Sequence, residues 1–190
     1  MKPFLYDGAW AEINEWNRHS LTLGWIWGAA PRGLTQWYSI NDVVGLQNNG
    51  KLPSGLDANY RFKANSSGIY VLNYTYQVRS KMKFQFWNYY FDDLMNTTWL
   101  QLDYTPQSWI FGLQFVTQIA GPKQYELEYN EQYYHPDEKT FVVNTRAGYQ
   151  IGAVALTANF LKVFEGGRFL FPRELGRENF YVSTPRNWED

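Results

Sequence analysis

The chain has 190 residues, of which 19% are aromatic and 18% charged, with a net charge of −1 and no cysteine. The aromatic content excludes intrinsic disorder, the near-zero charge argues against a nucleic-acid partner, and the missing cysteine excludes disulfides, cysteine-ligated zinc and thiol nucleophiles. The mean hydropathy is −0.49. No run approaches the roughly 18 apolar residues of a membrane helix, so helical membrane spans are excluded as well.

Apolar and polar residues alternate through most of the chain, as in a β-strand with one apolar face. The clearest case has tyrosine, leucine and valine at the even positions of Tyr70–Val78 and polar residues at the odd positions from Asn73 onward. The predicted strands are 21–27, 59–63, 69–79, 81–86, 100–104, 109–118, 140–150 and 154–160. With turn signals between them and no helical period, the chain is predicted to be all-β and antiparallel, with roughly eight to ten strands.

Most connections are tight turns, for example around Ser80, Asp92-Asp93, Thr105–Ser108 and Gln150–Gly152. Two are long, at about 28–56 and 120–138. Loops of this length usually have a function. The first is expected either to fold into or over a pore or to be a mobile surface loop. If every connection alternates sides, this strand count puts the two long loops at opposite ends of the sheet, which indicates that a strand has been missed or invented.

Two architectures produce this alternation. In a soluble sandwich the apolar face is the core, whereas in an outer-membrane barrel it meets lipid and the polar face lines a watery lumen. Strands of about 9–11 residues, repeated polar residues on the other face and aromatics near strand ends favour the barrel. Those aromatics are Trp25, Trp27, Trp87, Tyr89, Tyr90, Phe91, Trp99, Tyr104 and Trp109. In a barrel, one convex surface exposes Tyr70, Leu72, Phe84, Leu102 and Phe111; in a sandwich a second sheet covers them.

A segment near the C-terminal end carries a family resemblance. Residues 167–186 read GRFLFPRELGRENFYVSTPR. This resembles the FPREWGRE…PR signature of OprD-type outer-membrane porins, with Leu175 in place of the usual Trp. The blocks 19–28, 35–38, 83–90 and 112–115 also resemble the wall of that family, so the similarity spans most of the chain.

The resemblance implies an 18-stranded passive channel for small solutes such as amino acids or carboxylates, located in the bacterial outer membrane and contacting its lipid. The chain of residues 1–190 is expected to be one internal barrel segment of a longer porin, because it has too few strands, no signal peptide and no terminal strand ending in an aromatic residue. The full-length porin would be a homo-oligomer, typically a trimer. No cofactor, metal or nucleic acid is expected.

Basic residues on the polar faces are the candidate solute path. Arg61, Lys63, Arg79, Lys83 and Arg146 form a predicted cationic track, which would concentrate anions along a lumen. Arg173, Arg177 and Arg186 are added by the resemblance as lumen arginines. The alternative is that these are ordinary charges paired with acids such as Asp57 or Asp103, and that Glu174 and Glu178 form a local ion-pair network with the arginines beside them.

An enzyme has little support in the sequence. The two histidines, His19 and His135, lie far apart and have no metal-ligand spacing, and no nucleophile elbow or phosphate-binding loop occurs. Asp92-Asp93 is better explained as turn chemistry than as a cation site. The second functional hypothesis is a soluble all-β binding module with an aromatic core or a carbohydrate-binding face.

Overall fold

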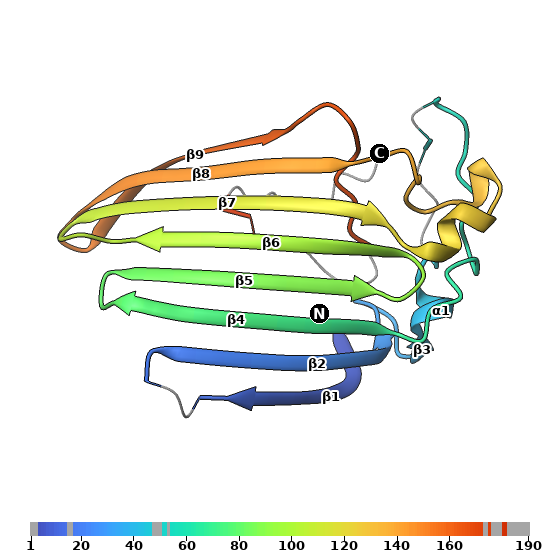
Figure 1. Ribbon diagram of the computed structural model, residues 1–190, viewed down its shortest axis with the longest axis horizontal. Coiled ribbons are helices and arrows are strands. Elements are labelled where there is room, and N and C mark those ends of the chain that lie inside the picture. The colour runs from blue at the N-terminus through green and yellow to red at the C-terminus, as the bar shows by residue number, and fades with distance from the viewer. Residues whose placement is uncertain are drawn as a thin grey trace.

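The computed structural model describes residues 4–14, 17–46, 51–52, 54–172, 175 and 180–181. One antiparallel sheet dominates it, and each long strand pairs with the next long strand along the chain (Figure 1). The strands are β1 (Leu5–Ile13), β2 (His19–Ala30), β3 (Tyr38–Ser39), β4 (Ile69–Arg79), β5 (Met82–Phe91), β6 (Met95–Tyr104), β7 (Trp109–Ala120), β8 (Thr140–Ile151) and β9 (Val154–Val163). The all-β antiparallel prediction is confirmed.

Two strand predictions were wrong. Residues 59–63 form no strand, and the strand β1 was not predicted. A bulge between Asp7 and Gly8 shifts the register of β1 against β2, so its alternation in sequence is interrupted. With these two corrections the long connections, 31–68 and 121–139, fall at the same end of the sheet, so the inference that the count had missed or invented a strand is confirmed (Figure 1).

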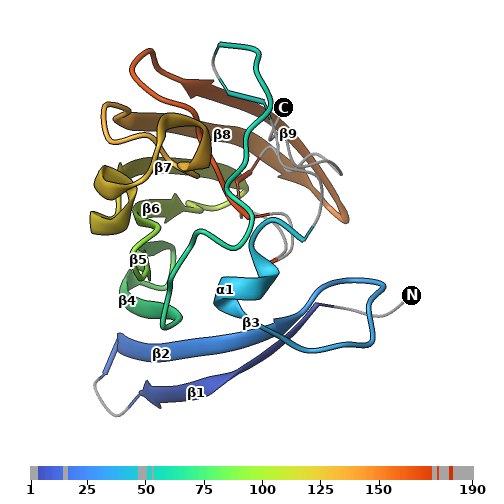
Figure 2. The same cartoon turned by 90° about the vertical axis from the view of Figure 1, so that its right-hand side faces the viewer.

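The sheet is an arc, as Figure 2 shows in a view along the strands. Its convex surface is apolar. Tyr70 and Phe111 are 42% and 40% exposed there. Leu72 and Leu102 are exposed as well, and Phe84 is half-buried. Among the described residues no second sheet covers this surface. The convex-surface prediction is therefore confirmed, and the sandwich is not formed.

Aromatic side chains on the convex surface gather near both ends of the strands. At the end with the long loops, Trp25 stacks on Tyr70 with ring centroids 6.1 Å apart. At the other end, Trp109 meets Tyr149 edge to face at 4.9 Å. Aromatic belts at both ends of the strands are typical of a transmembrane barrel wall.

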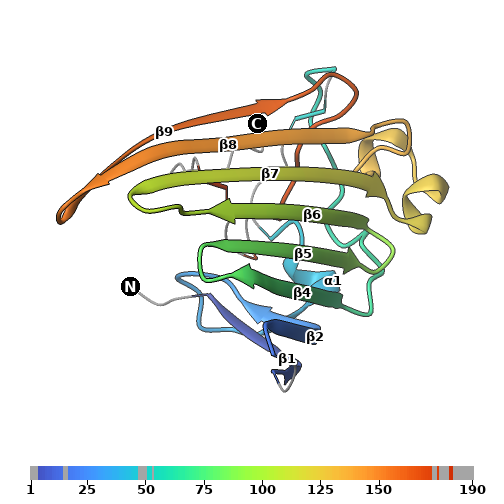
Figure 3. The same ribbon diagram turned by 60° about the vertical axis from the view of Figure 1, so that its left-hand side comes forward.

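Short turns connect the strands at the end opposite the long loops (Figure 3). Gly152, with a φ of 57°, makes the turn between β8 and β9, a backbone conformation that glycine adopts without strain. The predicted turn at Asp92-Asp93, at the loop end, is also confirmed. Leu94 N–H donates to Phe91 O there at 3.0 Å, and the Asp92 carboxylate accepts from Ser67 N–H at 3.0 Å.

The loop end carries the hydrophobic core. The helix α1 (Ile40–Val43) buries Ile40 and Val43 in a cluster that also contains Leu94 and Tyr134. The 3-10 helices η1 (Pro122–Glu126) and η2 (Tyr129–Glu131) lie in the second long connection. In Figure 2, α1 lies in the hollow of the arc. The first long connection is thus folded inward over that end of the concave face. No helix among the described residues is long and apolar enough to cross a membrane.

Candidate functional site

The concave face carries a row of amides that crosses three strands. Gln101 on β6, Gln114 on β7 and Asn144 on β8 lie side by side in the sheet register. Gln114 donates to Gln101 Oε1 at 2.8 Å, and Asn144 donates to Gln114 Oε1 at 2.9 Å. Gln114 and Asn144 are fully buried. The polar wall expected from the sequence is present, but these amides bond to one another instead of facing open water.

One step along the same strands lies an ion pair. Arg146 on β8 donates to Asp103 on β6 at 3.1 Å, and Gln101 donates to the other oxygen of this carboxylate at 2.6 Å. The strand between them has Gly112 at this level, in register with both residues. Because glycine has no side chain, the two charged groups meet across β7.

Tyr181 completes this cluster. It belongs to the part of the chain after β9, called the C-terminal segment below, of which residues 164–172, 175 and 180–181 are described. The Tyr181 hydroxyl donates to Asp103 at 2.8 Å, and the Arg146 guanidinium lies 4.2 Å from its ring centroid. A Cβ on Gly112 would come within 2.5 Å of this ring. The absent side chain at Gly112 therefore provides the space in which Tyr181 lies against the wall.

The segment around Leu170 is tied to the concave face by a buried side chain of β7. Gln118 donates to Leu170 O at 2.7 Å and accepts from Leu170 N–H at 2.9 Å. It also donates to Thr97 Oγ1 at 3.0 Å. The amide acts as a strand neighbour would, by pairing both polar groups of one residue. Phe169 and Phe180 contact each other and pack near Trp99.

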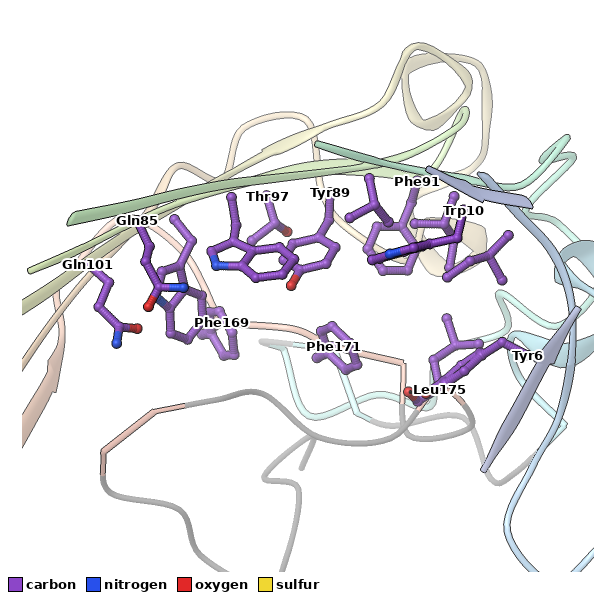
Figure 4. A pocket seen from close by; sticks show the side chains of 15 residues that line it. Tyr6, Trp10, Gln85, Tyr89, Phe91, Thr97, Gln101, Phe169, Phe171 and Leu175 are labelled. Atoms are coloured by element: carbon purple, nitrogen blue, oxygen red, sulfur yellow. Dashed lines mark hydrogen bonds between the residues drawn. The ribbon is translucent and has the colours of Figure 1, made fainter. Parts of the chain in front are cut away.

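Several aromatics expected in the outer belts face inward instead. Trp87, Tyr89 and Phe91 of β5 and Trp99 of β6 lie on the concave face. The sequence alternation already indicates this, because Trp87 lies two positions after Gln85 and four after Lys83 and therefore shares their polar face. Together with Phe169 and Phe171 these side chains line a cavity of about 530 Å³ (Figure 4).

A second ion pair joins the long loop 121–139 to the C-terminal segment. Glu138 accepts from Arg168 Nε at 2.8 Å and from the Arg168 backbone N–H at 3.1 Å. Nearby, His135 is 1% exposed, contacts Gln132 through Nδ1 at 2.7 Å and stacks on Tyr129. Glu138 and Arg168 therefore hold the folded loop against the C-terminal segment.

Acidification is expected to loosen this loop. Burial, and then the charge of Arg168, lower the pKa of His135 from 6.5, while Glu138 and Asp137 raise it less. Since the unfolded loop binds the proton more readily, the free energy of loop unfolding falls as the pH drops below about 6.5. Hydrogen exchange of residues 121–139 should be faster at pH 5.5 than at pH 7.5. A His135→Gln variant should lose this difference, and a difference retained in that variant would assign it to another group.

No known family model matches the sequence, and no curated protein matches it significantly. Solved structures do. OccK8 (OprE) of Pseudomonas aeruginosa aligns with a TM-score of 0.66 at 15% identity, covering 88% of this chain and 43% of that one. OpdK with vanillate and OccK2 (OpdF) with glucuronate, from the same organism, align at 0.62 and 0.60 with 13% and 15% identity. Each covers 85% of this chain and 38% of its own. The chain has the fold of an OprD-type porin wall.

This porin fold accounts for an arc with one apolar outer surface. The chain spans about two fifths of the length of the solved structures it matches. Within the described residues β1 and β9 each pair along one edge only, so the sheet is an open part of a barrel. The fold prediction, a segment of a larger porin barrel, is confirmed.

The predicted cationic residues of the porin wall fall in different places. Lys83 is on β5 directly opposite Asp103 in the register, which puts it on the concave face beside Arg146. Arg61 lies in the loop 31–68, exposed, with its guanidinium 4.6 Å from the Phe62 ring centroid. Lys63 pairs with Glu131 at 2.7 Å. These two residues are therefore not on a strand of the wall.

Of the other predicted cations, one ends a strand and three lie outside the described residues. Arg79 is the last residue of β4. Arg173, Arg177 and Arg186 lie outside the described residues. The two partners considered from sequence do pair, since Asp57 binds Lys51 and Asp103 binds Arg146. No group of three or more metal-ligating side chains occurs among the residues that the structure describes.

Proposed function

We propose that the chain is part of the wall of a bacterial outer-membrane porin, a passive channel through which small solutes diffuse along the concave face. The carrying observation is the sorting of the two faces. The convex surface exposes apolar residues between two aromatic belts, and the concave face holds amides and charges. The convex surface would contact outer-membrane lipid, and the complete porin would be a homotrimer.

We further propose that the solutes include carboxylates and that basic residues guide them. OpdK and OccK2 were solved with vanillate and glucuronate, which are both carboxylates. On this chain Arg79, Lys83 and Arg146 are the proposed wall cations, Arg61 is a proposed rim cation, and Arg173, Arg177 and Arg186 remain proposed lumen arginines. Passage of this kind needs no catalytic group and no cofactor.

Among the wall cations, Lys83 supports the proposal best. Asp103 neutralises Arg146, whereas Lys83 has no ion-pair partner among the described residues. An unpaired cation in a narrow channel raises the local concentration of anions more than a paired one does. The anion preference should therefore depend on Lys83 and be limited by Asp103.

Ion selectivity in planar bilayers tests this proposal. Lys83→Gln should move the reversal potential in a KCl gradient toward cation preference, and Asp103→Asn, which frees Arg146, should move it toward anions. Lys162→Gln is the matched control, because Lys162 pairs in register with Val143 on the convex side. Equal shifts in Lys83→Gln and Lys162→Gln, or no shift in either, would refute a cationic path on the concave face.

A further inference from the structure

The cavity under the C-terminal segment has a composition that anion guidance does not explain. Of its described lining residues none carries a formal charge, and most are aromatic. Its volume of about 530 Å³ lies within the range of small-molecule sites. Gln101 lines the cavity and also bonds to Asp103, so the amide row and the Asp103–Arg146 pair adjoin the cavity there. The part of the cavity lined by the described residues is therefore uncharged, and it adjoins the polar row at Gln101.

Aromatic rings border this cavity from two opposite sides. Trp87, Tyr89 and Phe91 project from β5, and Phe171 faces them from the C-terminal segment (Figure 4). Trp87 and Tyr89 are stacked parallel, at 4° and 5.7 Å between centroids. Phe171 also packs edge to face on Phe91, with ring centroids 6.0 Å apart. A flat or chair-shaped ring in the cavity would therefore make its apolar contact with Trp87 and Tyr89.

Polar groups without partners lie among these rings. Along β5 the Gln85 amide, the Trp87 indole N–H and the Tyr89 hydroxyl line the cavity. In the part of the chain that the structure describes, none of the three makes a hydrogen bond. Figure 4 shows the Gln85 amide and the Tyr89 hydroxyl directed into the cavity. Neutral donors and acceptors of this kind satisfy hydroxyl groups without requiring a charge.

We propose that this cavity is a binding site for a small uncharged ring compound that carries hydroxyl groups. The ring lies against Trp87 and Tyr89, and its hydroxyls bond to Gln85 and Tyr89. A sugar and an aromatic alcohol both have this chemistry. This proposal does not depend on anion conduction, because ligand binding in the cavity is measured on the folded chain alone.

Binding is measured by intrinsic tryptophan fluorescence of the refolded chain in detergent, because three tryptophans line the cavity: Trp10, Trp87 and Trp99. The probes are two pairs that differ in charge, methyl β-D-glucoside with glucuronate and benzyl alcohol with benzoate. We expect saturable binding of at least one neutral probe, several-fold tighter than its carboxylate. Which neutral probe saturates identifies the ring. Equal or tighter binding of the carboxylates, or no saturation, overturns the proposal.

A pair of matched variants locates the site. Tyr89→Phe removes one hydroxyl inside the cavity and should weaken binding about fivefold, the effect of one hydrogen bond. Tyr90→Phe makes the same change on the opposite face of β5, where the ring lies 6.3 Å from Tyr70, and should leave binding unchanged. Both variants should show the same gel mobility as the parent chain, with and without heating. Equal weakening in the two variants refutes the cavity as the site, whatever the selectivity measurements give.

Discussion

An arginine in place of Leu100 should destabilise the folded chain by about 2–4 kcal/mol in lipid vesicles, the effect of a cation near the bilayer midplane on the lipid face of a barrel. Leu100 lies midway along β6, is 38% exposed on the convex surface and is in register with Phe86 and Phe115. The measurement is the free energy of unfolding in urea, with refolding into the same vesicles.

The control for this substitution is a second arginine on the same surface at a different depth. Ile119 is 52% exposed and lies next to the last residue of β7, at the loop end. Ile119→Arg should destabilise the chain by about 0–1 kcal/mol, because charges near the interface are tolerated. On a surface in contact with water both arginines would change stability by about 0.5 kcal/mol or less, and that result would contradict a lipid-facing wall.

The convex surface could be predicted because it depends only on local alternation. Each strand places every second side chain on the same face, so Tyr70 and Phe111 were assigned without any knowledge of strand pairing. The same rule failed for 59–63, where the alternation is short. Tyr60 is instead buried and packs edge to face on Tyr133 in a loop. Two apolar–polar repeats do not distinguish a strand from a loop that buries one aromatic ring.

The inward aromatics show a different limit. Residue type suggested that Trp87 and Tyr89 belong to an interfacial belt, whereas parity placed them with Lys83 and Gln85. Parity was the stronger signal, because a strand cannot move one side chain to the other face without a bulge. Residue type is the better guide to the face of a side chain only where the alternation is interrupted, as at the bulge of β1.

The contacts of the C-terminal segment could not be predicted from local sequence. Tyr181 lies against Gly112, 69 positions earlier in the chain, and Gln118 binds Leu170. Glycine in a strand and glutamine on a polar face each have several common roles, and only the fold reveals their partners. The candidate site therefore depends on long-range contacts that alternation does not encode.

The largest effect inside the concave face is expected for Gln118→Leu, which keeps the side-chain volume and removes both amide hydrogen-bonding groups. Leu170 is 7% exposed, so its N–H and C=O would lose their only described partner without gaining water. At about 1–3 kcal/mol for each of these two buried unsatisfied groups, the chain should lose about 2–6 kcal/mol of stability. The urea unfolding midpoint should fall accordingly.

The same variant shows whether the segment of residues 169–172 narrows the proposed channel. Released from Leu170, the segment should leave the concave face, which exposes its phenylalanines to chymotrypsin and widens the path. Cleavage in this segment and the single-channel current should both rise in Gln118→Leu. Thr117→Val is the matched control, because Thr117 is exposed on the opposite face of β7. Lower stability with unchanged cleavage and current would mean that Gln118 supports the wall without positioning the segment, and the segment would then set no part of the channel width.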